Sequence, residues 1–247
     1  MHWKTAISKI DDGHESVRGY NLEKLAEQKN YAAVVYLILR GKLPTEAEEK
    51  MVNSMLVMMV DHGPGAASAL AARIVNSAGN SIHASVAAGV LSLGGSRHGG
   101  ALGGAAKFFA ANIDNKDIAG ILAEMKKNKV YVPGYGHKVL KLDNRAEALL
   151  QIAKKNKLYG KYCEFAERVR EEINKTSSKQ LPLNMDGANA AILLDMGFDP
   201  KVIEGMFLIA RMPGLVAQVF EEMNSGEGLR RTDEGDIEYI GEAEKEL

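Results

Sequence analysis

Apolar side chains recur every three or four positions along most of the chain, which is the spacing of one buried face of an amphipathic helix. After about residue 21 this pattern predicts roughly twelve helices and almost no sheet. Residues 4–20 alternate weakly instead, and the Asp12-Gly13 pair within them predicts a short β-hairpin. The expected fold class is therefore all-α, with one hairpin near the N-terminus.

Several positions carry signals for the start or end of an element. Thr45 and Glu48 have the spacing of a capping box, and Asp143 is expected to cap a later helix. The Pro213-Gly214 pair predicts a break between two helices, because proline has no backbone N–H to donate. In the polar C-terminal tail, residues 237–240 have the pattern of a short strand.

One uncharged segment, residues 74–96, is long enough to be considered as a membrane span. It contains asparagine, histidine, serine and glycine, and these polar groups are costly in hydrocarbon. We therefore interpret it as two buried helices broken at Gly79-Asn80, and we expect no membrane association.

Composition narrows the class of protein and its partners. The chain has 247 residues, of which 46% are hydrophobic and 26% charged, so it can form one large domain or two closely packed small ones. Because 31 basic side chains balance 32 acidic ones, a nucleic-acid partner is not expected. Cys163 is the only cysteine, which excludes an internal disulfide, and no signal peptide is visible at the start. A cytoplasmic location is expected.

The histidines are the first candidates for chemistry. None of the six belongs to an H-E-x-x-H motif or to a Cys/His cluster with zinc spacing, so no metal site is expected. The phosphate-binding P-loop motif does not occur either. His62, His98 and His137 each stand at a chain break beside glycine, and Asp186 stands at a helix start. A helix N-terminus favours neutral imidazole and ionised carboxylate.

With Arg145 and Arg211, these four side chains would suit carbanion chemistry on a substrate with several negative charges. Taken singly, each histidine is more often a structural cap or a packed side chain. The pattern of residues alone therefore leaves both interpretations open.

Longer motifs supply a template. They are Arg18-Gly19-Tyr20-Asn21-Leu22, Val132-Pro133-Gly134-Tyr135-Gly136-His137 with Arg145 downstream, and Asn184-Met185-Asp186-Gly187. By these motifs the chain resembles the citrate synthase superfamily over about residues 5–240. Asp61-His62-Gly63-Pro64 and the short stretch between Thr45 and His62 resemble its citryl-CoA lyase branch, which includes the C-terminal module of ATP-citrate lyase.

The resemblance implies a citrate-synthase-like fold with a large and a small domain. Residues 1–101 and 192–247 would form the large domain, through which the chain would form a homodimer or a higher homo-oligomer. Residues 102–191 would form the small, mobile domain on the CoA side.

The resemblance also implies roles for individual residues. His98, His137 and Asp186 match catalytic residues of the family. Residues that match groups holding the substrate carboxylates are His62, Arg145, Arg211 and Arg231, the last donated by a neighbouring subunit, with Arg230 as the alternative match. Residues expected to bind CoA are Val132, Gly134, Tyr135, Gly136, Lys138 and Lys141.

The implied activity is that of a citryl-CoA lyase, which cleaves citryl-CoA to acetyl-CoA and oxaloacetate. No cofactor beyond the CoA moiety is expected, and citrate and a citryl-CoA synthetase are further expected partners. Two alternatives remain. The chain would be a minimal citrate synthase or a lyase for a related acyl-CoA such as citramalyl-CoA, or it would be a non-catalytic structural subunit of an ATP-citrate lyase-like assembly.

Overall fold

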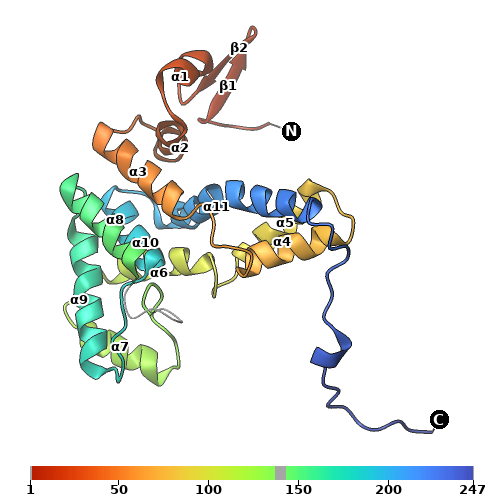
Figure 1. Cartoon of the computed structure of the whole chain (residues 1–247). Coiled ribbons are helices and arrows are strands. Elements are labelled where there is room, and N and C mark those ends of the chain that lie inside the picture. The colour runs from red at the N-terminus through yellow and green to blue at the C-terminus, as the bar shows by residue number, and fades with distance from the viewer. Residues whose placement is uncertain (1, 137–142, 247) are drawn as a thin grey trace. The chain divides into compact units, whose positions relative to one another are not determined.

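The computed structural model describes residues 2–136 and 143–246 and is mostly helical (Figure 1). The described residues contain eleven α-helices and one three-stranded sheet. The predicted all-α class with an N-terminal hairpin is therefore confirmed. The chain divides into two compact units, residues 1–61 with 93–213 and residues 62–92 with 214–247.

The sheet of the first unit follows from one tight turn. Strands β1 (Ser8–Asp11) and β2 (His14–Val17) pair antiparallel around Asp12 and Gly13, whose φ angles are 47° and 79°. Two consecutive positive φ angles are typical of the type I′ turn that joins two strands. A third strand, β3 (Tyr20–Asn21), pairs with β2 and was not expected from the sequence.

The N-terminal helices begin and end where the capping signals lie. The Thr45 hydroxyl accepts a hydrogen bond from Glu48 N (3.2 Å), and Thr45 N donates to the Glu48 carboxylate (2.7 Å), so the capping box is confirmed. Gly41, with φ of 77°, ends the preceding helix. These helices are α1 (Leu22–Gln28), α2 (Tyr31–Arg40) and α3 (Glu46–Met58).

Helix α10 (Met185–Asp195) packs against three other helices of the first unit (Figure 1). These are α6 (Gly100–Asn112), α8 (Asn144–Lys155) and α9 (Lys161–Thr176), and α9 also contacts α7 (Ile118–Lys127). Ala188, Ala190 and Ala191 are fully buried, and their small side chains allow close approach of the surrounding helices. The fold thus places the first turn of α10, which carries Asp186, at the end of a tightly packed helix.

Two sequence-based expectations are wrong. Helix α11 (Pro200–Met223) continues through Pro213 without a break. Proline removes one backbone hydrogen bond, but Leu215 and Val219 beyond it are fully buried, and their burial offsets that loss. Residues 237–240 form no strand, because they are exposed and pair with no neighbouring strand in the described structure.

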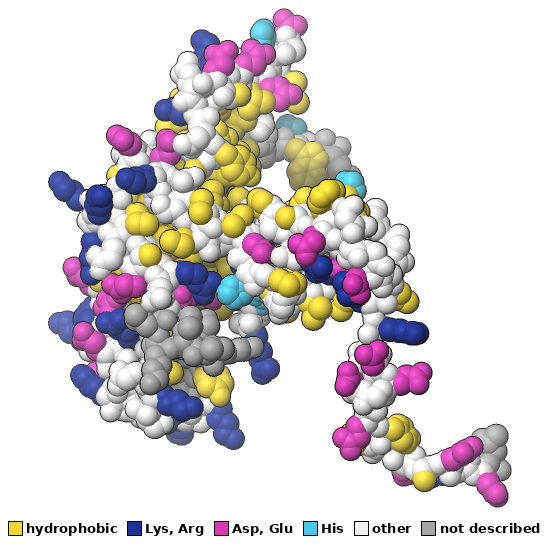
Figure 2. Space-filling model, in the orientation of Figure 1, with side chains coloured by type: hydrophobic (Ala, Val, Ile, Leu, Met, Phe, Trp, Pro, Cys, Tyr) yellow, Lys and Arg dark blue, Asp and Glu magenta, His cyan; other side chains and the backbone are white. Residues whose placement is uncertain are grey.

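The second unit contains α4 (Ala67–Ser77), α5 (Ile82–Leu93) up to residue 92, the end of α11 and the short 3-10 turn η1 (Glu234–Asp236). The predicted break at Gly79-Asn80 is confirmed, with Gly79 at φ of 87°. A Cβ on Gly89 would lie 2.9 Å from the Ser68 carbonyl oxygen, so glycine there permits close packing of α4 and α5. Figure 2 shows acidic side chains along the exposed tail that follows.

Helix α11 is also long and apolar enough to cross a membrane by length and composition, a test that core helices of soluble proteins pass too. The predicted mobile domain, residues 102–191, lies wholly within the first unit, and the division into a large and a small domain stays a prediction.

Candidate active site

A glycine-containing loop lies against the start of α10. Gly134 has a φ of 90°, and a Cβ on it would lie 2.8 Å from Gly187 Cα. Asn184 N donates to Gly134 O (3.0 Å), and Gly136 N donates to Pro182 O (2.8 Å). Glycine at positions 134 and 187 permits this approach, so two motifs about fifty residues apart meet at one place.

The Tyr135 side chain fixes this loop from the other direction. Its hydroxyl donates to Ala166 O on α9 (2.8 Å), and its ring packs edge-on against Phe109, with ring centroids 6.2 Å apart. Burial raises the pKa of the Tyr135 phenol well above its ordinary value, so the hydroxyl stays protonated. Contacts of Val132, Tyr135 and the loop glycines with CoA stay a prediction.

Asn184 joins the loop to the first turn of α10. Its side-chain oxygen accepts hydrogen bonds from Asp186 N (3.0 Å) and Gly187 N (3.1 Å), which caps the helix. Its side-chain nitrogen donates to Gly136 O (3.0 Å). One amide therefore sets the position of the residue before His137 relative to Asp186. His137, Lys138 and Lys141 themselves lie outside the described residues.

Asp186 has the electrostatic character of a proton donor and acceptor. Burial raises the pKa of its carboxyl from 3.8 to about 6, and the negative charge of Asp143 adds to the rise. The positive charges of Arg145 and Arg211 lower it in part. The three predicted residues Asp186, Arg145 and Arg211 are thus electrostatically coupled, as a site for an anionic substrate requires.

Arg145 is held by a carboxylate two residues before it. Arg145 Nε and Nη2 each donate to Asp143 at 3.0 Å, one to each carboxylate oxygen. Burial would raise the pKa of Asp143, but the hydrogen bonds and charge of Arg145 hold it below its ordinary value. From the sequence, Asp143 is expected only to cap a helix. Its spacing from Arg145 is the one signal of this second contact.

Arg211 comes from α11 and is buried, with 4% of its surface exposed. Its Nε donates to Met59 O (2.8 Å), and its guanidinium lies 4.8 Å from the centroid of the Phe207 ring. Burial lowers the pKa of Arg211, while Asp61 and Asp186 oppose that shift. A buried guanidinium beside carboxylates suits the binding of a further carboxylate from a substrate.

His98 lies in the turn before α6, as the glycine pattern predicts. Its ring meets the Phe207 ring edge-on, with centroids 6.0 Å apart. A Cβ on Gly99 would lie 2.9 Å from Phe207 and from Leu93 O, so this turn requires glycine. Phe207, which has no signal of its own in the sequence, therefore contacts both His98 and Arg211.

The remaining predicted residues, His62, Arg230 and Arg231, belong to the second unit. Arg230 is bound within that unit: Nε and Nη2 donate to the buried Glu222 carboxylate at 2.7 and 3.3 Å, and Arg73 Nε donates to the same carboxylate at 2.8 Å. Arg231 is exposed beside this cluster. Of the two candidates, Arg231 is thus the arginine not held by Glu222.

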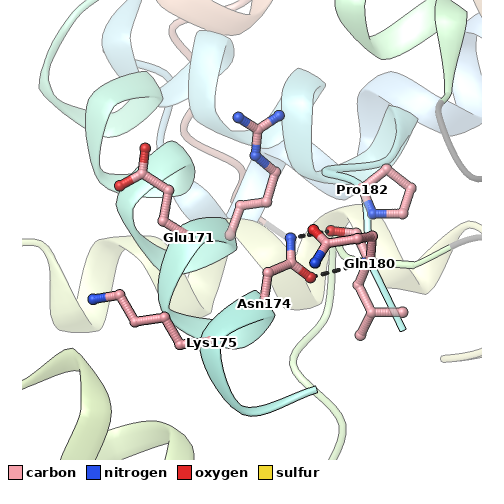
Figure 3. A pocket seen from close by; sticks show the side chains of 7 residues that line it. Glu171, Asn174, Lys175, Gln180 and Pro182 are labelled. Carbon is pink, nitrogen blue, oxygen red and sulfur yellow. Dashed lines mark hydrogen bonds between the residues drawn. The ribbon is translucent and has the colours of Figure 1, made fainter. Parts of the chain in front are cut away.

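A cavity of about 480 Å³ lies between the end of α9 and the strand-like segment before α10 (Figure 3). Asn174 clamps that segment, since its side chain accepts from Leu181 N (2.7 Å) and donates to Leu181 O (3.1 Å). Pro182, which also lines the cavity, accepts the hydrogen bond from Gly136.

Within residues 2–136 and 143–246 no cluster of three metal-ligating side chains occurs.

This geometry can now be compared with known proteins. The chain matches the family described as "Citrate synthase, C-terminal domain" over residues 2–55 and 45–232. The chain belongs to the citrate synthase family. The family resemblance drawn from the motifs is therefore confirmed.

Relatives within the citrate synthase family include both lyases and synthases. The structure of citryl-CoA lyase from Hydrogenobacter thermophilus superposes with a TM-score of 0.92 at 45% identity, covering 99% of this chain and 97% of that one. ATP-citrate synthase subunit 1 of Sordaria macrospora is 30% identical over 83% of this chain and 32% of its own length. Citrate synthase 2 of Bacillus subtilis is 29% identical over 91% of this chain and 59% of its own length.

The chain thus spans about a third of the length of the Sordaria ATP-citrate synthase subunit and nearly the whole of the Hydrogenobacter lyase.

Proposed function

We propose that this protein is a citryl-CoA lyase that cleaves citryl-CoA to acetyl-CoA and oxaloacetate. The observation that carries the proposal is the 45% identity to the Hydrogenobacter lyase along nearly the full length of both chains. Asp186 adds support, because a carboxyl with a pKa of about 6 exists in both protonation states near neutral pH.

In the proposed reaction His137 removes the proton of the citryl hydroxyl as the carbon–carbon bond breaks. The oxygen becomes the ketone of oxaloacetate, and the bonding electrons move into the enolate of acetyl-CoA. His98 donates a hydrogen bond to the enolate oxygen, and the Asp186 carboxyl gives its proton to the enolate carbon. A thioester enolate is unstable in water, so a positioned donor at its oxygen lowers the barrier substantially.

Substrate binding is assigned to the basic side chains. Arg145, Arg211 and His62 hold the carboxylates of citryl-CoA, and Arg231 reaches the site of a neighbouring subunit. Lys138 and Lys141, with Val132 and the 134–136 loop, bind the CoA moiety. No cofactor beyond CoA takes part. Lysine can bind phosphate as a point charge, although it lacks the fork of arginine.

The active assembly in this proposal is a homodimer or a higher homo-oligomer in the cytoplasm. Residues 102–191 close over the bound substrate and exclude water from the site. A citryl-CoA synthetase supplies the substrate, since citryl-CoA must be made by activation of citrate with CoA.

A minimal citrate synthase is the second candidate, favoured by the similarity to citrate synthase 2 of Bacillus subtilis. One experiment separates the two: purified protein is incubated with citryl-CoA and the products are resolved by chromatography. Acetyl-CoA with oxaloacetate indicates the lyase, whereas free citrate with CoA indicates hydrolysis by a synthase. Intact citryl-CoA after incubation would refute both and favour a structural subunit.

A further inference from the structure

Asp143 makes more contacts than a helix cap needs. The residue is 2% exposed, and its carboxylate accepts four hydrogen bonds. Oδ1 accepts from Arg145 N (3.2 Å) and Arg145 Nε (3.0 Å), while Oδ2 accepts from Arg145 Nη2 (3.0 Å) and Met185 N (3.2 Å). Burying a carboxylate costs free energy unless it is paired and hydrogen-bonded, and these four hydrogen bonds offset that cost for Asp143.

The four donors belong to two different helices. Arg145 lies in the first turn of α8, and Met185 is the first residue of α10, immediately before Asp186. The two parallel bonds from Nε and Nη2 fix the plane of the guanidinium, which a single bond would not do. One carboxylate therefore ties the arginine expected to bind substrate to the helix turn that carries the proton-transferring carboxyl.

Charge adds a second link between the same groups. Among the described residues, Asp143 raises the pKa of Asp186 through its charge, and Arg145 and Arg211 lower it. Without the charge of Asp143, two arginines would act on Asp186 unopposed by that anion. The pKa of Asp186 would then fall, and less of it would be protonated near neutral pH.

We propose that Asp143 is a positioning residue, which holds the Arg145 guanidinium and the first turn of α10 in one fixed arrangement so that substrate binding and proton transfer occur at the correct spacing. The inference deepens the proposed lyase function and rests on it. Asp143 itself acts through Arg145 and Asp186 and has no assigned contact with substrate.

Asp143→Asn is the sharpest perturbation, because the amide keeps the shape of the side chain. In one orientation its NH₂ group replaces Oδ2 and faces the donors Arg145 Nη2 and Met185 N. In the other it replaces Oδ1 and faces Arg145 N and Nε. Either way two donors lose their acceptor, and the charge is lost as well.

Two measurements that do not require turnover test this role. Calorimetry with oxaloacetate should show about 10- to 100-fold weaker binding to Asp143→Asn, since hydrogen bonds to charged groups are lost. Carbon NMR of labelled aspartates, with the Asp186 signal assigned through Asp186→Asn, should show Asp186 titrating at a lower pH than in the wild type.

Asp195→Asn is the matched control. The Asp195 carboxylate also accepts three backbone hydrogen bonds at a helix start, from the N–H groups of Gly160, Tyr162 and Cys163 at 2.8–3.0 Å. The same chemical change there should lower the melting temperature but leave oxaloacetate affinity and the titration of Asp186 unchanged. Asp143→Glu, which keeps the charge, is the second variant in case Asp143→Asn does not fold. It should weaken oxaloacetate binding while Asp186 still titrates near the wild-type pH.

An Asp143→Asn protein with wild-type oxaloacetate affinity and an unmoved Asp186 titration would overturn the inference. Equal effects in Asp195→Asn would also overturn it, because they would reduce Asp143 to a structural cap. The citryl-CoA product assay on the wild type is separate: its failure refutes the lyase function, whereas the titration of Asp186 judges the positioning role.

Discussion

Replacing Asp186 with asparagine should slow turnover and, near neutral pH, raise the free energy of unfolding relative to the wild type. An amide cannot donate or accept the proton at the acetyl carbon, and general acid–base steps typically contribute about 10²–10⁴-fold to rate. Turnover of citryl-CoA should fall by that factor. The affinity for substrate should stay within about tenfold of wild type, because the amide keeps the shape of the carboxyl.

The raised pKa gives the magnitude. At pH 7 a carboxyl with a pKa of about 6 is roughly one-tenth protonated, whereas one at the ordinary 3.8 is protonated in less than about one molecule in a thousand. Burial thus increases the acid form of Asp186 about a hundredfold. In the proposed mechanism this acid form is the proton donor at neutral pH, which an exposed aspartate would not supply.

The raised pKa of Asp186 also makes the free energy of unfolding depend on pH. The folded protein binds this proton more tightly than the unfolded chain, so the stabilisation is complete below pH 3.8 and is lost as the pH rises through about 6. The two pKa values differ by about two units, which corresponds to roughly 3 kcal/mol at neutral pH. Asp186→Asn removes this titration. The free energy of unfolding of the variant should therefore increase relative to that of the wild type as the pH rises from 4 to 7.

Urea denaturation of both proteins at pH 4.5 and pH 7.5, at equal protein concentration, measures the stability gap, and the citryl-CoA assay measures the rate. A variant that keeps more than a tenth of the wild-type rate would show that Asp186 is not the proton donor. A stability gap that is the same at both pH values would refute the raised pKa.

Other substitutions and measurements test the rest of the site. His98→Phe should slow citryl-CoA cleavage and solvent deuterium exchange into acetyl-CoA by about 10²–10³-fold, the cost of one oxyanion donor; unchanged rates would make His98 structural. Arg231→Ala should raise KM for citryl-CoA with little change in melting temperature, whereas Arg230→Ala should lower the melting temperature because it strips Glu222 of a partner; the reverse result would identify Arg230 as the binding residue. Light scattering at micromolar protein should give a dimer or larger, and a monomer mass would contradict the proposed assembly. Saturating CoA and oxaloacetate should slow hydrogen exchange within residues 102–191, and identical exchange with and without ligands would count against closure of that region.

Local signals in the sequence were sufficient for the N-terminal hairpin turn and for the helix start after Thr45. The Asp12-Gly13 turn and the Thr45 capping box depend on groups at most three residues apart, so neighbouring residues determine them. The prediction of a helix break at Pro213 was wrong because it used local information alone. Its local effect is to break a helix, but Leu215 beyond it is fully buried and lies beside Gly89, which is more than a hundred residues earlier in the chain.

The sequence by itself determined the helical class through its hydrophobic periodicity and the family through its motifs. The catalytic and binding roles of individual residues stay predictions. Only the tertiary structure decided what those residues are next to. Asp143 and Met185 are far apart in the chain, yet one hydrogen bond between them ties Arg145 to the turn that holds Asp186. The pKa of about 6 likewise arises from burial and from charges on other segments, and no window of sequence contains these.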